Sequence, residues 1–243
     1  MQKAGNRAGG SQSSPVEELL TEIVRRGANE VWGLGLSEGQ LGQLVRFADL
    51  LTEWNATRMN LTRLTSPRDI AVKHFLDSLA LLTAWTPPSD ARALDVGTGA
   101  GLPGLALKIA RPDLEMTLLD GTAKKLSFCR AVADDLGLEG IETVHARAEE
   151  AGRRDDLRGR FALVTARAVA PLERLLPWLA PFVAPGGIAV ALKGTGVAEE
   201  MAAARPVARR LGLTLALPVA VALPEAEEPT VRQIVLASRK ETP

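Results

Sequence analysis

Residues 93–104 read Ala-Leu-Asp-Val-Gly-Thr-Gly-Ala-Gly-Leu-Pro-Gly. A short apolar run ends in the acid Asp95, and four glycines follow it, namely Gly97, Gly99, Gly101 and Gly104. Glycines adopt backbone conformations that other residues avoid, and they leave the main chain open to a ligand. The pattern is typical of a β-strand that turns tightly into a helix at a ligand-binding edge. The stretch therefore predicts an α/β fold.

Asp95 separates two interpretations of this turn. Residues 99–104 alone match the G-x-G-x-x-G fingerprint of dinucleotide-binding proteins, and Asp120 follows near the distance expected for a ribose-binding acid. A carboxylate at the strand end would, however, repel a pyrophosphate group. S-adenosylmethionine carries a sulfonium and an ammonium group, and Asp95 would attract both. The turn therefore favours S-adenosylmethionine, and an NAD-dependent oxidoreductase remains the alternative.

Composition sets the broad class of protein. The chain has 243 residues, of which 46% are hydrophobic and 24% charged, as in an ordinary globular protein. Its 29 Lys and Arg balance 29 Asp and Glu, so any contact with RNA must come from a local basic patch. The single cysteine, Cys129, excludes an internal disulfide and is typical of a reducing cytoplasm. We expect no metal, because the chain has only two histidines, and no membrane span.

The chain divides into three regions. Residues 1–14 are polar and rich in Gly, Ser and Gln, which predicts a disordered tail. Residues 15–86 predict a helical region on the substrate side. One helix would begin with a capping box at Ser37, and Ser66 would be the N-cap of a second helix that leads into residues 70–85. A Pro-Pro linker follows, and residues 87–243 predict a Rossmann-like domain.

Strands and helices alternate from residue 92 onward. Apolar runs predict five strands, over 92–96, 116–120, 141–145, 161–165 and 188–192. Helices are expected between them, notably over 103–110, 123–136 and 171–183, and two closing strands over 213–223 and 230–238, joined by a hairpin. This alternation predicts a parallel sheet with helices on both faces, whose strands end together at one ligand-binding edge.

Three residues at that edge are candidates for the cofactor side of a site. Asp120 ends the second strand, where an acid accepts hydrogen bonds from both ribose hydroxyls of an adenosine. Ala148 and Glu149 follow the third strand and could recognise an adenine, although an acid at a helix start also interacts with the helix dipole.

Other residues are candidates for the substrate side. Arg167 follows the fourth strand and could bind an RNA phosphate or the cofactor's carboxylate through its planar guanidinium. Lys193 ends the fifth strand and either contacts a nucleic-acid backbone or is a solvated lysine. His74 and Asp77 share one helix face as a functional pair or as structural groups. Asn60 predicts an Asx turn or a contact to substrate.

Basic residues could form a rim for RNA around this edge. Such charges are as often part of a solvated face, and the sequence does not show that they meet in space. The candidates are Lys124, Lys125 and Arg130, together with Arg63, Arg68 and Lys73.

Six blocks together resemble one known family. They are residues 60–62 (Asn-Leu-Thr), 73–79 (Lys-His-Phe-Leu-Asp-Ser-Leu), 95–104, 167–172 (Arg-Ala-Val-Ala-Pro-Leu), 193–194 (Lys-Gly) and 231–236 (Val-Arg-Gln-Ile-Val-Leu). They resemble the ribosomal RNA small-subunit methyltransferase G family, also called glucose-inhibited division protein B, over residues 37–240. Only the glycine turn is widespread among methyltransferases, whereas the second and fourth blocks are specific. One departure is Ala162, where the family often has Asp.

The resemblance implies a class I S-adenosylmethionine-dependent methyltransferase. Its fold would be a mostly parallel seven-stranded sheet with an N-terminal helical extension, and its substrate 16S ribosomal RNA or a small-subunit precursor. The enzyme would methylate N7 of one guanosine. We expect a monomer, and the sequence itself leaves the oligomeric state open. In the family, positions matching Gly97, Leu102, Ala148, Glu149 and Arg167 contact S-adenosylmethionine, and the acid matching Asp120 belongs to the ribose site.

The chemistry at N7 explains why no catalytic base stands out. Guanine N7 has a free lone pair and no proton, so it attacks a sulfonium methyl group without prior deprotonation. Catalysis then rests on positioning, for which the candidates are Arg167, Lys193, His74 and Asp77. A third alternative is an RNA-binding factor that keeps the cofactor fold without catalysis.

Overall fold

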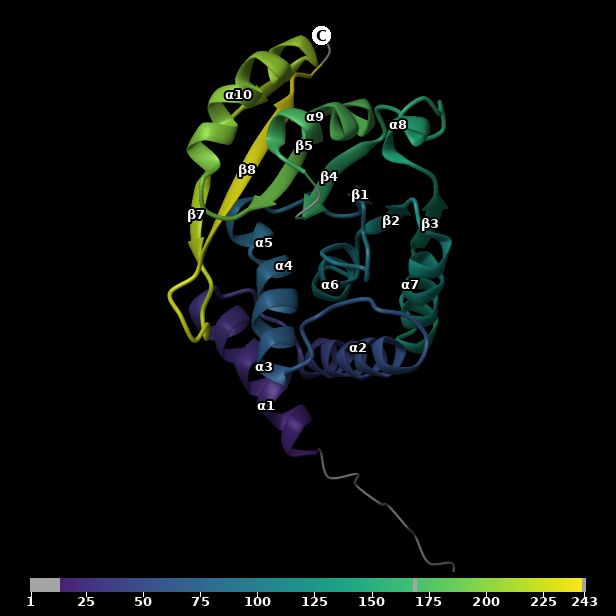
Figure 1. The fold of residues 1–243 in the computed structure, drawn as a ribbon, viewed down its shortest axis with the longest axis vertical. Coiled ribbons are helices and arrows are strands. Elements are labelled where there is room, and N and C mark those ends of the chain that lie inside the picture. The colour runs from purple at the N-terminus through teal and green to yellow at the C-terminus, as the bar shows by residue number, and fades with distance from the viewer. Residues whose placement is uncertain (1–13, 168–169, 242–243) are drawn as a thin grey trace, which may run out of the picture.

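The computed structural model describes residues 14–167 and 170–241, so residues 1–13 of the expected tail lie outside it. The described residues form an eight-stranded sheet in the order β3-β2-β1-β4-β5-β8-β6, with β7 also paired to β8 (Figure 1). The first five strands run parallel and β8 runs antiparallel to β5. The strands are β1 (Arg92–Val96), β2 (Glu115–Asp120), β3 (Ile141–His145), β4 (Phe161–Arg167), β5 (Val183–Lys193), β6 (Leu213–Leu215), β7 (Val219–Ala222) and β8 (Val231–Arg239).

The five expected parallel strands are confirmed, but the first closing strand differs. Residues 213–223 were expected as one strand and form β6 and β7 instead. The pairing partner of Leu215 on β8 is Ala237, whereas that of Val219 is Ile234, so the register shifts by one residue between them. Pro218 lies in this gap, and a proline cannot donate a ladder hydrogen bond.

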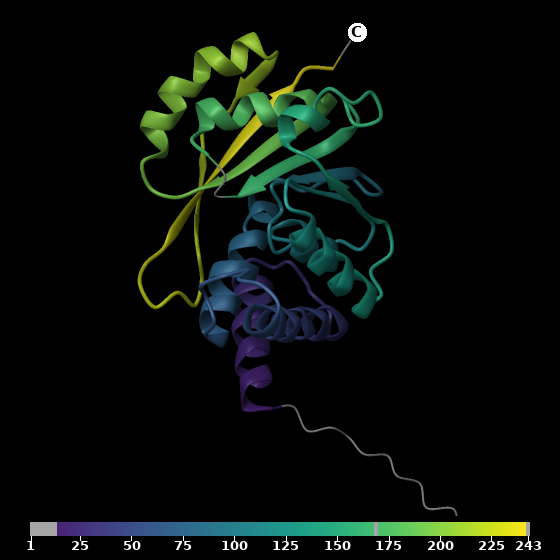
Figure 2. The same cartoon turned by 45° about the vertical axis from the view of Figure 1, so that its right-hand side comes forward.

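Helices cover both faces of the sheet (Figures 1 and 2). The N-terminal helices, α6 and α7 pack on one face, and α8, α9 and α10 on the other. The helices are α1 (Pro15–Val24), η1 (Arg25–Val31), α2 (Glu38–Thr57), α3 (Pro67–Asp69), η2 (Ile70–Leu76), α4 (Asp77–Leu79), α5 (Leu81–Ala84), α6 (Gly104–Ala110), α7 (Ala123–Asp135), α8 (Ala148–Ala151), α9 (Leu172–Leu179), η3 (Ala180–Phe182) and α10 (Val197–Arg210).

Side chains of β5 show how the two cores arise. Ile188, Val190 and Leu192 belong to the core beneath the N-terminal helices, while Ala189 and Ala191 belong to the core beneath α9 and α10. Because successive side chains of a strand point to opposite faces, a continuous apolar run is buried on both sides. The expected parallel sheet with two covered faces is therefore confirmed.

The helix starts that the sequence predicts are confirmed. Ser37 and Gln40 form a capping box at the start of α2, and the Ser66 side chain accepts a hydrogen bond from the Asp69 amide. The helix expected over 70–85 is present as far as Ala84 but is not a regular α-helix, because it consists of the π-helical stretch η2, the short helix α4, a turn at Ala80 and the short helix α5. Such wide turns are frequent at functional sites.

The helix expected over 171–183 is shorter than predicted. It ends as α9 at Leu179 and tightens into the 3-10 turn η3, after which Val183 begins β5. Pro177 lies inside α9 and Pro181 follows in η3. Each proline removes an amide donor, so the regular helix cannot continue through both.

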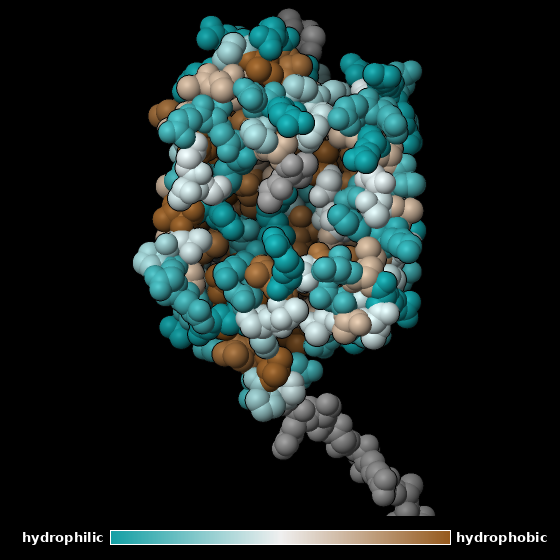
Figure 3. All heavy atoms as spheres, viewed as in Figure 1, coloured by the Kyte–Doolittle hydropathy of each residue, from teal (hydrophilic) through white to brown (hydrophobic). Residues whose placement is uncertain are grey.

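The surface of the described residues carries few large apolar groups. Val16 and Leu19 on α1 are 53% and 44% exposed. A small patch of hydrophobic residues, coloured brown, lies over the start of α1 at the lower end of Figure 3. No helix within residues 14–167 and 170–241 is long and apolar enough to cross a bilayer. The same residues contain no group of three metal-binding side chains.

Candidate functional site

Asp95 organises the turn between β1 and α6. Its Oδ2 accepts hydrogen bonds from the Thr98 hydroxyl at 2.6 Å and from the Gly104 amide at 2.9 Å. A Cβ on Gly104 would lie 2.4 Å from Leu118 Cδ2 and 2.9 Å from Asp95 Oδ2. The turn therefore requires glycine at 104, and Asp95 holds the chain at the start of α6.

The Asp95 carboxylate faces the interior, which the sequence did not predict. Its side chain is fully buried, and its Oδ1 has no hydrogen-bond partner among the described residues. Burial raises the pKa of Asp95 to about 6, against the lowering effect of the Thr98 and Gly104 hydrogen bonds. A direct contact between this carboxylate and a ligand does not fit its position. The expected attraction between Asp95 and a sulfonium group would therefore act through space, without direct contact, and it stays a prediction.

A first cavity, the Asp120 cavity, opens where β2 and β3 end. Its volume is about 440 Å³. Asp120 Oδ2 accepts from the Gly99 amide at 3.0 Å and Oδ1 accepts from the Thr122 amide at 2.8 Å. Each carboxylate oxygen keeps acceptor capacity beyond these bonds. The cavity is also lined by Gly97, Lys125, Ala148, Glu149, Arg167 and Trp178.

A second cavity, the His74 cavity, lies between η2 and the ends of β1, β4 and β5. Its volume is about 510 Å³. His74 Nε2 lies 2.9 Å from the Thr62 hydroxyl, and its buried Nδ1 has no hydrogen-bond partner among the residues that the structure describes. Burial, helped by the positive charge of Arg167, lowers the pKa of His74 to about 4. The imidazole is therefore neutral at physiological pH.

Asp77 connects three elements in the His74 cavity. Its side chain is 4% exposed, and its Oδ2 accepts a hydrogen bond from Arg167 Nη1 at 3.1 Å. Its Oδ1 accepts from Arg232 Nε. Arg167 also donates to the Lys73 carbonyl at 2.9 Å. One buried carboxylate thus ties the start of α4 to the end of β4 and to β8, and it holds two guanidinium groups at the cavity wall.

The remaining cations of this cavity are also paired. Lys193 Nζ lies 2.8 Å from Glu200 and donates to the Ala170 carbonyl at 2.9 Å. Lys73 Nζ lies 2.5 Å from Asp69. Every lysine and arginine that lines the cavity therefore has a carboxylate partner, which holds it in a defined position.

Gly97 and Arg167 line both cavities. Gly97 has φ of 72° and Gly99 of 59°, conformations in which a side chain would be strained. A Cβ on Gly99 would meet only the Gly97 carbonyl, at 3.9 Å, so the space beside it is open. The two cavities therefore adjoin along bare backbone, with the Arg167 guanidinium at their boundary.

Most of the predicted site residues come together at this edge. Those that line one or both cavities are Lys73, His74, Asp77, Gly97, Gly99, Leu102, Asp120, Lys125, Ala148, Glu149, Arg167 and Lys193. Gly101 instead lies under α6, where its Cβ would be 2.3 Å from Leu105 Cδ1.

Five of the predicted RNA contacts lie outside both cavities, namely Asn60, Arg63, Arg68, Lys124 and Arg130. Asn60 and Lys124 are exposed. The loop near Asn60 is held by Asn55, whose Oδ1 accepts from the Leu61 amide at 2.7 Å and the Thr62 amide at 2.9 Å. The Asx turn expected at Asn60 is therefore replaced by a longer-range contact, and the RNA-binding roles of Asn60 and Lys124 stay predictions.

Some lining residues were missed by sequence reasoning. They are Thr62, Trp178, Glu200 and Arg232. Arg232 could have been found, because Lys193 pairs with Gln233 in the antiparallel ladder between β5 and β8. Trp178 carries no such signal, since its position depends on how α9 packs over the end of the sheet.

Cys129 supports the glycine turn from beneath. Its buried Sγ lies 3.6 Å from the Gly99 carbonyl, to which the thiol donates. Burial raises the pKa of this thiol well above its usual range. The group is therefore a neutral part of the packing rather than a nucleophile.

Comparisons with known proteins identify relatives over most of the chain. The family model for rRNA small subunit methyltransferase G matches residues 40–221. A ribosomal RNA small subunit methyltransferase G from Alkaliphilus oremlandii is 37% identical over 224 residues, which is 92% of each chain. Its counterpart from Caldanaerobacter subterraneus subsp. tengcongensis is 40% identical over 184 residues, or 76% of each chain.

A solved structure supports the fold. The crystal structure of a predicted O-methyltransferase from Agrobacterium tumefaciens is similar with a TM-score of 0.52 and 21% identity, over 69% of this chain and 83% of that chain. The class I methyltransferase fold expected from the resemblance is confirmed. The oxidoreductase alternative finds no support among these relatives. The chain belongs to the rRNA small subunit methyltransferase G family and is a methyltransferase.

Proposed function

We propose that this enzyme transfers the methyl group of S-adenosylmethionine to N7 of one guanosine in 16S ribosomal RNA. The relatives are ribosomal RNA small subunit methyltransferases, which supports the class of substrate. The observation that carries the proposal is the boundary that the Asp120 and His74 cavities share at Gly97 and Arg167. One cavity suits an adenosine and the adjoining one suits a nucleotide.

The Asp120 cavity fits the adenosine half of S-adenosylmethionine. The Gly99 and Thr122 amides orient the Asp120 carboxylate, and its remaining lone pairs can accept both ribose hydroxyls. Ala148 and Glu149 would border the adenine, and Gly97 and Gly99 offer bare backbone beside the methionine part. S-adenosylmethionine would supply an electrophilic methyl group at the boundary of the two cavities.

The His74 cavity suits N7 as the acceptor. Its two carboxylates, Asp77 and Glu200, are engaged with cations, and burial lowers the pKa of His74 to about 4, which makes its imidazole a weak base. A nucleophile that loses a proton before attack would need a free base, whereas N7 has a lone pair and needs none. The paired cations Lys193 and Arg232 border the space for the nucleotide and can contact its phosphate.

Positioning is the catalytic contribution that we assign to the chain. Arg167, held by Asp77 and by the Lys73 carbonyl, lies at the boundary where donor and acceptor meet. Correct alignment of two reactants can contribute roughly 7–11 kcal/mol to a bimolecular step. We also propose that the region over 15–86 borders the RNA through Asn60 and Lys73, together with Lys124 and Lys125 of α7.

Methyl transfer from labelled S-adenosylmethionine onto small subunits from a strain that lacks this gene tests the proposal. We expect incorporation into 16S RNA and a new strand scission at one guanosine after borohydride and aniline treatment, which detects N7-methylguanosine. Incorporation at another atom, or scission that is unchanged, would contradict the assignment to N7.

A companion titration separates the alternatives. Calorimetry with S-adenosylmethionine and with NADH should show binding of the first alone. Cofactor binding without transfer to any form of the RNA would instead favour a non-catalytic RNA-binding factor. Comparison of protein-free RNA, a precursor particle and the small subunit would identify the form that the enzyme recognises.

A further inference from the structure

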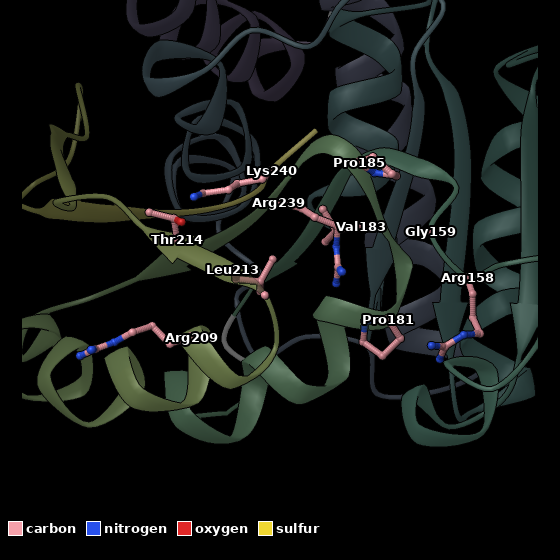
Figure 4. A pocket seen from close by; sticks show the side chains of 11 residues that line it. Arg158, Gly159, Pro181, Val183, Pro185, Arg209, Leu213, Thr214, Arg239 and Lys240 are labelled. Carbon is pink, nitrogen blue, oxygen red and sulfur yellow. The ribbon is translucent and has the colours of Figure 1, made fainter. Parts of the chain in front are cut away.

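A cavity of about 730 Å³ lies at the opposite edge of the sheet from the site described above. The parallel strands β4 and β5 begin here, and the antiparallel strand β8 ends here. The cavity is bordered by residues just before β4, at the start of β5, at the end of α10 and around β6 (Figure 4). We call it the Arg239 cavity. It shares no lining residue with the Asp120 or His74 cavities.

Four cations line the Arg239 cavity. They are Arg158, Arg209, Arg239 and Lys240, and its lining contains no acid. Figure 4 shows Arg239 extending from β8 into the middle, with Arg158 on one side and Arg209 and Lys240 on the other. The charges therefore come from separate parts of the chain that the fold brings around one hollow.

These cations lack the carboxylate partners found at the catalytic edge. Among residues 14–167 and 170–241, none of the four forms an ion pair. Glu241 follows Lys240, and its side chain lies beside Gly186, next to the lining residue Pro185, without forming an ion pair with any of the four cations. In a chain with zero formal net charge, four unmatched cations around one hollow create a local positive field.

Two of the arginines are already held in place. Arg239 Nη2 donates to the Ala180 carbonyl at 2.7 Å, and Arg158 Nη1 donates to the Gly152 carbonyl. Arg239 Nε is buried and has no partner among the described residues. These bonds to carbonyls orient the guanidinium groups without neutralising their charge, so both keep donors for an anion.

We propose that the Arg239 cavity binds the phosphodiester backbone of RNA, as a contact separate from the methylation site. Phosphate oxygens are the anions that arginine and lysine recognise without regard to sequence. The lining offers no aromatic ring on which a base could stack. Cations on two sides of the hollow suit a chain of successive phosphates better than a nucleotide whose base needs recognition. RNA as the ligand rests on the proposed function.

The double variant R209Q/K240Q tests this contact. Both side chains are exposed and make no hydrogen bond within the described residues, so neutralising them should leave the fold intact. The matched control is R174Q/R205Q, which removes two exposed charges from α9 and α10 outside all three cavities. Affinity for a labelled single-stranded fragment of 16S RNA is measured over a range of salt concentrations.

We expect R209Q/K240Q to bind RNA about tenfold more weakly at low salt than the wild type. The slope of log affinity against log salt should fall by about 1.4, since each phosphate contact to a single strand contributes about 0.7. The control should match the wild type in both quantities. Equal affinity and slope in R209Q/K240Q and the wild type would overturn the proposal.

Further arms separate the possible failures. Titration with inorganic phosphate tests the alternative source of the anion: phosphate binding lost in R209Q/K240Q while RNA binding is unchanged would also overturn the proposal. Circular dichroism and S-adenosylmethionine affinity report whether the variants fold. Absence of methyl transfer by the wild type would refute the proposed function. The salt slopes would still show whether RNA binds at the Arg239 cavity.

Discussion

At the scale of single residues, Asp95 and His74 are both buried, with pKa shifts in opposite directions. The pKa of Asp95 rises from 3.8 to about 6, so the folded protein holds this proton more tightly than the unfolded chain. The contribution of protonated Asp95 to the free energy of unfolding is fully present below pH 3.8 and is lost as pH rises through 6. The pKa of His74 falls from 6.5 to about 4, so its contribution is present above pH 6.5 and is lost as pH falls through 4.

The first prediction is that single variants expose these opposing trends. Relative to the wild type, D95N should gain about 3 kcal/mol of unfolding free energy between pH 4 and pH 7, because it removes a carboxylate that must ionise while buried. H74Q should lose a similar amount over the same range. Urea denaturation at several pH values measures both differences. Parallel pH profiles for D95N and the wild type would contradict the assignment to Asp95.

At the scale of elements, Asp77 joins α4 to β4 and β8. D77N should destabilise the protein by about 3 kcal/mol, because Arg167 and Arg232 lose their shared carboxylate in a partly buried place. Adding R232Q to D77N should recover part of the loss, because one uncompensated charge is removed. Thermal unfolding of both single variants and the double variant measures this coupling.

A positioning role for Asp77 has its own signature. D77N should lower kcat for methyl transfer more than it raises the KM for S-adenosylmethionine, because Asp77 lines the His74 cavity and reaches the Asp120 cavity only through Arg167. A purely structural role would lower the amount of folded enzyme and leave both constants of the folded fraction unchanged.

The contact between α6 and the sheet gives a second prediction at this scale. G104A should destabilise the protein by about 1–3 kcal/mol, because its Cβ would overlap Leu118 and Asp95. G42A is the matched control: Gly42 lies inside α2 with open space where its Cβ would be, so alanine there should stabilise by about 1 kcal/mol. Denaturant midpoints should therefore move in opposite directions, and a gain for G104A would contradict the packing described here.

Local patterns predicted the elements better than their junctions. The strands follow from apolar runs that end in polar residues, and the starts of α2 and its successor follow from Ser37 and Ser66. The inward orientation of Asp95 could not be predicted, since it depends on how closely Gly104 approaches β1 and β2. The ladder between β5 and β8 could have placed Arg232 near Lys193, but its contact with Asp77, 155 residues away in sequence, could not be predicted from local patterns.

At the scale of the whole molecule, the helical region and the sheet share a core. Residues from α1, α2 and η2 pack in one hydrophobic cluster with residues from β1, β2 and β5. The domain boundary near residue 86 stays a prediction, and this shared core indicates that the two parts unfold together.

The fourth prediction tests this cooperativity with tryptophan fluorescence. Trp32, Trp54 and Trp85 pack against the core of the helical region, and Trp178 packs against the opposite face. In W178F, fluorescence reports on the helical region alone, and its urea midpoint should coincide with that from circular dichroism. Two separate midpoints would show that the regions unfold independently.

The amino-acid composition does not show how charge is distributed between the two edges of the sheet. The chain is neutral overall, yet the cations of the His74 cavity are matched by carboxylates while those of the Arg239 cavity are not. A total charge sums over both edges of the sheet, so the sequence could not reveal this difference without the fold.

The rate at which the Cys129 thiol is labelled reports how often the glycine turn opens. Because it is protonated and shielded beneath Gly99, a thiol-specific reagent can reach it only when the turn or α7 opens. We expect labelling of the native protein to be at least about tenfold slower than labelling in urea. It should be slower still with S-adenosylmethionine, because a ligand bound at the turn favours the closed state. Mass spectrometry measures the labelling over time. Equally rapid labelling of the native and the urea-unfolded protein would show that the turn opens freely.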